Sequence, residues 1–124
     1  PGETLAARPI AEALPGAVDL VGRTTLLEAA AVLTRAALFV GNDSGLMHVA
    51  AAAGAPTVGL FGPSRAEHYG PRGARAVAVR TPIPYERLFP PGYDRHTTPS
   101  LMTSLEVPPV LAACQRLLAS CRTP

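Results

Sequence analysis

Apolar positions along the chain follow two different periods, which together predict helices alternating with strands. Apolar residues three and four positions apart predict helices at residues 3–14, 26–34, 46–53 and 107–120. Short apolar runs predict strands at residues 18–21, 37–40, 57–61 and 74–79. The runs at 37–40 and 57–61 are typical of central parallel strands that are buried on both faces. We therefore predict an α/β fold with a parallel, doubly wound sheet.

Turn and capping residues mark the boundaries between these elements. Thr24 or Thr25 can cap the helix at 26–34, since Glu28 lies in its first turn. Ser64 can cap a short helix at 65–69. Five prolines between residues 81 and 100 preclude regular structure, so a long irregular loop is expected there.

Length and composition fit a single folded domain. The chain has 124 residues, of which 48% are hydrophobic, enough for a core built mainly from Ala, Val and Leu. No apolar run reaches the ~18 residues of a membrane span, and no leader is visible, so we expect a cytoplasmic protein. Peripheral contact with the inner membrane stays open. The opening Pro1-Gly2-Glu3, without an initiator Met, is typical of a sequence cut from a larger protein.

Charge and cysteine content exclude several classes of function. The net charge is +2, and every basic residue is an Arg, scattered without a cluster, which argues against nucleic-acid binding. Cys114 and Cys121 stand seven residues apart in one predicted helix, too far for a disulfide within it, and we expect two free thiols. The polar residues of the loop match no metal-ligand spacing, so we expect neither a metal nor a cofactor.

Candidate chemistry concentrates at residues 41–48. A predicted buried strand ends there and a helix begins near Ser44, at the sheet edge where ligands bind in parallel α/β folds. The first amides of that helix and its dipole make an anion site, and Gly45 lets a phosphate approach the backbone. Ser44 adds a hydroxyl, and His48 follows one turn later on the same face. In the alternative, Asp43 only caps the helix and His48 is an ordinary core or surface residue.

Two further turns are expected beside this one. Gly62-Pro63-Ser64 ends the next strand and opens a helix, which predicts one crevice shared with the first turn. Thr24-Thr25 would provide a third strand-to-helix turn on the same side. Arg65 is a candidate phosphate partner, although a solvated Arg at a helix start explains it equally well.

Three segments resemble a known family closely. They are residues 19–26 (DLVGRTTL), residues 36–50 with the core Asp43-Ser44-Gly45-x-x-His48, and residues 56–64 ending Leu60-Phe61-Gly62-Pro63-Ser64. Together they resemble the C-terminal domain of the ADP-heptose:lipopolysaccharide heptosyltransferases, glycosyltransferase family 9. The match covers residues 1–70 well and residues 98–118 more loosely, and residues 81–97 match nothing in that family.

This resemblance implies a Rossmann-like three-layer α/β/α domain, the C-terminal half of a GT-B enzyme. Residues 1–124 would be the nucleotide-sugar-binding domain, and the N-terminal acceptor domain would be absent. By position, Asp43, Ser44, Gly45 and His48 would line the diphosphate and sugar of ADP-heptose. Thr24 and Thr25 would lie by the adenine through their backbone. Glu3 would bind the ribose hydroxyls. In the alternative, it is an ordinary first-turn helix residue favoured by the helix dipole.

The same resemblance limits what this chain can do alone. An inverting transfer to the lipopolysaccharide core needs a base to deprotonate the acceptor, and the family's base lies in the other domain. We therefore expect no catalytic residue here, no transferase activity from the isolated chain and at best weak nucleotide binding. Two alternatives stay open: a stand-alone nucleotide-binding module, and a GT-B-like nucleotide-sugar epimerase, whose turn is usually followed by acidic residues. Exposed apolar surface could make the chain self-associate.

Overall fold

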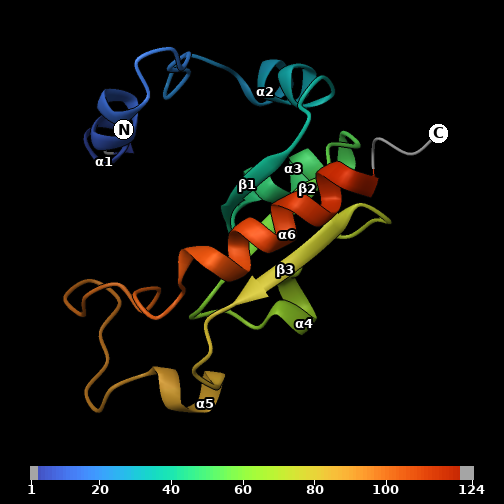
Figure 1. Cartoon of the computed structure of the whole chain (residues 1–124). Helices are drawn as coiled ribbons and strands as arrows, with labels where there is room; N and C mark the ends of the chain where they lie inside the picture. Colours follow the sequence, from blue (N-terminus) through green and yellow to red (C-terminus); the bar gives the residue numbers. More distant parts are fainter. Residues whose placement is uncertain (1–2, 121–124) are drawn as a thin grey trace.

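A small parallel sheet forms the centre of the molecule. The computed structural model of the chain describes residues 3–120 and contains a three-stranded sheet with helices on both faces (Figure 1). Its strand order is β1-β2-β3, and both pairings are parallel. The strands span Phe39–Asn42 (β1), Thr57–Phe61 (β2) and Ala76–Arg80 (β3). The predicted α/β class is confirmed.

Helices cover the two faces of the sheet unequally. Helix α3 packs on β1 and β2, whereas α6 crosses the opposite face over β2 and β3 (Figure 1). The remaining helices are shorter or stand away from the sheet. The helices span Glu3–Ala13 (α1), Leu26–Leu33 (α2), Gly45–Ala52 (α3), Ala66–Tyr69 (α4), Tyr85–Leu88 (α5) and Val107–Ser120 (α6). None of the helices within residues 3–120 is both long and apolar enough to cross a membrane.

Strand β2 is the most deeply buried element. Val58 and Phe61 are 0% and 1% exposed, and Thr57 is also fully buried. Helix α3 seats closely on this strand because Gly59 has no side chain: a Cβ there would lie 2.5 Å from the Sδ of Met47. Met47 is itself fully buried. The prediction that residues 57–61 form a strand buried on both faces is confirmed.

Strand β1 differs from its prediction in both position and burial. It spans Phe39–Asn42 rather than residues 37–40, and Val40 is 43% exposed. Its register aligns Phe39 with Thr57, so pairing with β2, rather than the apolar run, sets where the strand begins. In the described part of the chain β1 is an edge strand, and α6 packs mainly on β2 and β3, which leaves one face of β1 less covered.

The predicted strand at residues 18–21 is absent, and this prediction was wrong. Val18 is 80% exposed, and a turn follows in which the carboxylate of Asp19 accepts a hydrogen bond from the amide of Val21 at 3.0 Å. A strand needs a neighbour to satisfy its backbone groups, and no strand of residues 3–120 lies beside this segment. The expected third strand-to-helix turn at Thr24-Thr25 therefore has no strand before it.

The proline-rich loop contains one regular turn that the sequence did not predict. Helix α5 follows Pro84, a residue that fits a helix start. The rings of Tyr85, Phe89 and Tyr93 then stack edge to face, with centroids 5.1 Å and 4.9 Å apart in successive pairs. These aromatic contacts give the segment a small apolar cluster of its own.

We expect Phe61→Ala to lower the free energy of unfolding by about 3–5 kcal/mol, since it removes the largest fully buried side chain of the chain's described part. Chemical denaturation followed by circular dichroism measures this change. The matched control is Val18→Ala, at an 80% exposed position, which should change stability by less than about 0.5 kcal/mol. Equal effects of the two substitutions would contradict the assigned core.

Candidate functional site

The carboxyl ends of β1 and β2 open into one pocket. The register aligns Asn42 with Leu60, and the amide of Asp43 extends the pairing by donating to the Leu60 carbonyl at 3.2 Å. Both strands therefore end at the same level, and the turns that follow them face each other. A pocket of about 160 Å³ lies between them, lined by Asn42, Asp43, Leu60, Gly62, Pro63, Ser64 and Met102. The predicted shared crevice is confirmed.

The start of α3 has the geometry expected for anion binding. Ser44 is the N-cap residue in extended conformation, and its side chain makes no capping hydrogen bond. The Ser44 carbonyl accepts from the amides of Met47 and His48, so the helix ladder begins after Gly45 and Leu46. A Cβ on Gly45 would meet no heavy atom within 4 Å. The first turn thus presents uncapped amides to the surface, where a phosphate can accept their hydrogen bonds.

Asp43 and His48 face each other across this turn. The Nε2 of His48 lies 4.0 Å from Oδ1 of Asp43, which is an ion-pair distance but too long for a hydrogen bond. The side chain of Asp43 is 23% exposed and that of His48 is 48% exposed. Asp43 lines the pocket and His48 does not, so His48 stands beside the carboxylate that faces the pocket.

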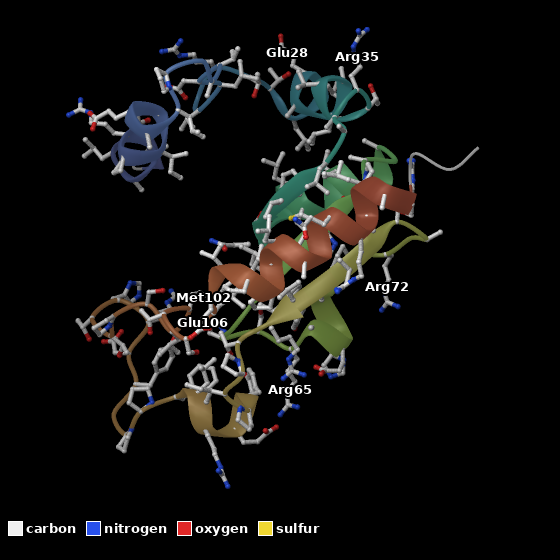
Figure 2. The ribbon with its side chains drawn as sticks, in the orientation of Figure 1. Glu28, Arg35, Arg65, Arg72, Met102 and Glu106 are labelled. Carbon is white, nitrogen blue, oxygen red and sulfur yellow. The ribbon has the colours of Figure 1, made fainter. Side chains whose placement is uncertain are left out.

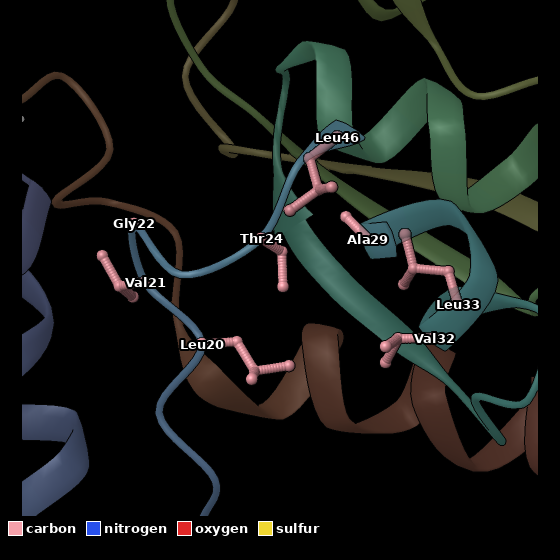
Figure 3. A pocket seen from close by; sticks show the side chains of 8 residues that line it. All are labelled: Leu20, Val21, Gly22, Thr24, Ala29, Val32, Leu33 and Leu46. Atoms are coloured by element: carbon pink, nitrogen blue, oxygen red, sulfur yellow. The ribbon is translucent and has the colours of Figure 1, made fainter. Parts of the chain in front are cut away.

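A larger apolar hollow lies on the other side of the same turn (Figure 3). Its volume is about 350 Å³, and its lining includes Leu20, Val21, Thr24, Val32, Leu33 and Leu46. Leu46 comes from the first turn of α3, so the hollow borders the uncapped amides of that turn directly. Its size and aliphatic walls suit the flat face of a ring system. The turn from Asp43 to Leu46 thus lies between a small pocket with polar and apolar lining and a larger apolar hollow.

Thr24 and Thr25 have different surroundings. Thr24 lines the apolar hollow, whereas Thr25 is the N-cap of α2 and forms a capping box with Glu28. The Glu28 carboxylate accepts hydrogen bonds from the Thr25 amide at 2.7 Å and its hydroxyl at 2.9 Å. These bonds hold the pKa of Glu28 below its ordinary value. Of the two threonines, Thr24 lines the hollow and Thr25 does not.

Two other candidates lie away from the pocket. Glu3 is the first residue of α1, which stands apart from the sheet in Figure 1; the side chain of Glu3 is not described by the structure.

Arg65 points to α5, where its guanidinium lies 4.3 Å from the Tyr85 ring centroid and 3.1 Å from the Glu86 carboxylate (Figure 2). A backbone hydrogen bond, assisted by Arg65, lowers the pKa of Glu86. Arg65 thus stabilises the loop rather than facing the α3 turn.

Met102 lines the pocket although it was not among the residues predicted for the site; it lies in residues 98–118, the segment that resembles the family more loosely. It enters the pocket from the segment that leads into α6, far along the chain from the two turns. Leu20 and Leu46, which line the apolar hollow, also read as ordinary core positions in the sequence. Within residues 3–120 no group of three or more His, Cys, Asp or Glu side chains could hold a metal ion.

Comparison with known proteins gives a family match over most of the chain. The sequence profile of glycosyltransferase family 9 (heptosyltransferase) matches residues 2–88. That range includes the α3 turn and the Gly62-Pro63-Ser64 turn but not Met102. No solved structure is significantly similar to the chain.

Curated relatives agree with the family match over about half the chain. Lipooligosaccharide heptosyltransferase 2 of Haemophilus influenzae is 40% identical over 63 residues, which are 51% of this chain and 18% of that protein. Lipopolysaccharide heptosyltransferase 2 of Escherichia coli and that of Salmonella typhimurium are each 39% identical over 70 residues, 56% of this chain and 20% of theirs. The matched stretch therefore spans about a fifth of the length of these relatives.

The capping box predicts how stability responds to pH. Because the folded-state pKa of Glu28 is lowered, its stabilising effect is complete above the unfolded pKa and is lost as pH falls through the folded value. We expect Glu28→Gln to melt at a lower temperature than the wild type near neutral pH, with the difference vanishing in acid. Thermal melts across this pH range measure it, with Glu12→Gln, an exposed α1 glutamate, as the control. A difference that grows toward acid would contradict the assignment.

Proposed function

Since the chain belongs to glycosyltransferase family 9, we propose that it is the donor-binding part of a heptosyltransferase. In this proposal residues 1–124 form the C-terminal nucleotide-sugar-binding domain of an inverting GT-B enzyme. The donor is ADP-heptose, and the acceptor is the lipopolysaccharide core. The observation that carries the proposal is the uncapped start of α3, which lies between an apolar hollow and a small mixed pocket.

The two hollows match the two ends of a nucleotide sugar. The apolar hollow of about 350 Å³ suits the base, and Thr24 lies in its lining. The diphosphate would rest on the amides of Gly45 and Leu46, with the Ser44 hydroxyl beside it. The pocket of about 160 Å³ is below the size of a whole-ligand site, so it suits a single sugar unit. Asp43 would accept hydrogen bonds from sugar hydroxyls there, with His48 beside it.

Burial of the residue after the turn favours this function over an epimerase. In that alternative an acidic residue would follow the small-residue turn closely. Here Met47 occupies such a position, is 0% exposed and packs over Gly59. An ionised carboxylate at this place would be buried without a partner, which costs several kcal/mol. The other alternative, a stand-alone nucleotide-binding module, differs from the proposed enzyme only because it has no acceptor-binding domain.

The acceptor side and the catalytic base belong, in this proposal, to a further domain. The curated relatives are several times longer than the stretch that matches them. Several large apolar side chains are exposed on the part of the chain that precedes β1; Leu5, Val18 and Leu27 are 73%, 80% and 82% exposed. Contact with that domain would cover them, and without it the isolated chain would self-associate. We place the enzyme in the cytoplasm, with peripheral contact at the membrane that holds the acceptor.

Calorimetric titration of ADP, UDP, GDP and ADP-heptose into the chain and into Asp43→Ala tests the proposed donor site. We expect the wild type to prefer ADP and Asp43→Ala to bind ADP-heptose about tenfold more weakly, because one charged hydrogen-bond acceptor is removed. Asp94→Ala, which removes a carboxylate in the exposed loop, is the matched control. Equal binding of ADP-heptose by wild type and Asp43→Ala would contradict the role of Asp43.

A glycine substitution separates ligand approach from folding. A Cβ on Gly45 meets nothing within 4 Å in the chain, so Gly45→Ala should leave the melting temperature unchanged or slightly raised. The added methyl group would nevertheless stand where the diphosphate approaches, and we expect nucleotide affinity to fall about tenfold. Gly16→Ala is the matched control, because its Cβ also meets nothing within 4 Å. Undiminished ADP binding by Gly45→Ala would exclude the α3 start as the phosphate site.

A further inference from the structure

One wall of the small pocket comes from a segment that the match to the family profile does not reach. Met102 lies between the proline-rich loop and α6, at the end of the sheet where β1 and β2 finish (Figure 2). The profile match stops at residue 88. Met102 nevertheless lines the same pocket as Asp43 and Ser64. The segment after the match is therefore part of the pocket's construction.

Local hydrogen bonds hold this methionine in place. The Met102 amide donates to the Ser100 hydroxyl at 3.2 Å, and the Met102 carbonyl accepts from the Leu105 amide at 2.9 Å. These bonds close two consecutive turns around the residue. Its backbone is thus fixed before α6 begins at Val107.

Gly62 is the residue that lets the methionine reach the pocket. A Cβ on Gly62 would lie 2.5 Å from the Met102 Sδ and 3.3 Å from the Leu101 carbonyl oxygen. Both distances are shorter than ordinary van der Waals contact, so a larger residue would push the segment outward. The missing side chain at the end of β2 is filled by the Met102 thioether. Gly62 and Met102 therefore act as one packing unit.

The chemistry of this wall points to the ligand group that it meets. A thioether is apolar and polarisable, with no hydrogen atom to donate and only weak acceptor strength. It offers nothing to a phosphate oxygen. Asp43 and Ser64 line the same pocket and carry hydrogen-bonding groups. A pocket with both apolar and polar lining fits a sugar ring, which has C–H faces and a hydroxyl edge.

We propose that Met102 is a specificity-determining residue that contacts the transferred sugar of the nucleotide-sugar donor, an inference that rests on the proposed function. The thioether packs against the C–H face of the sugar while Asp43 binds its hydroxyls. Nucleotide alone does not reach this wall. Met102 thus separates recognition of the sugar from recognition of the nucleotide.

Titration of the full chain with ADP and with ADP-heptose, followed by NMR, tests this assignment. We expect Met102→Ala to bind ADP-heptose about tenfold more weakly while its affinity for ADP is unchanged. Met102→Leu, which keeps an apolar side chain of similar volume, should restore most of the ADP-heptose affinity. Equal losses for both ligands, or no loss for either, would overturn the role of Met102.

The outcomes also distinguish this inference from the function on which it rests. If the wild-type chain binds neither ligand even weakly, the proposed donor site and the role of Met102 both fall. In another outcome, Asp43→Ala loses affinity for ADP-heptose while Met102→Ala binds both ligands normally. That result would support the proposed donor site and refute only the role of Met102.

A ligand-free cycle checks the packing unit separately. Gly62→Ala should destabilise the wild-type chain more than it destabilises Met102→Ala, because the collision with Sδ is gone in the second background. The same loss in both backgrounds would show that Met102 does not occupy the end of β2, and the assignment would fall.

Discussion

The parallel pairing of β2 with both of its neighbours determines where every other part of the site lies. β2 aligns with β1 on one side and with β3 on the other, and the amides of Asp43 and Thr81 continue the two ladders onto the Leu60 and Phe61 carbonyls. The strands consequently end at the same level. Two chain reversals, one after β1 and one after β2, are thereby brought against each other.

Small residues then convert this alignment into a binding surface. Gly59 admits Met47 and fixes α3 on the sheet, and Gly62 admits Met102 and closes the pocket on its far side. Gly45 leaves the start of α3 open. The three glycines therefore act differently: Gly59 lets a helix pack on the sheet, Gly62 lets Met102 pack against the end of β2, and Gly45 exposes backbone amides. Loss of the β2 alignment would move these three positions apart.

Sequence reasoning succeeded where local pattern and tertiary environment agree. Residues 57–61 and 107–120 were predicted at the bounds observed, because the first is buried on both sides and the second is amphipathic. It failed where pairing decides: residues 18–21 have strand-like composition but no neighbour within the described chain, and β1 begins two residues later than its apolar run. The facing turns followed from topology alone. The contact between Gly62 and Met102 could not be predicted, since nothing local connects residues so distant in sequence.

The most direct test of the donor site at the α3 turn is an NMR titration of the chain with ADP, following every backbone amide. Saturable shifts should appear at Gly45 and Leu46 and around the apolar hollow, at Leu20 and Thr24, while the amides of α5 stay unchanged. Saturable binding with shifts confined to α5 or to the outer edge of β3 would contradict a nucleotide site between the two hollows.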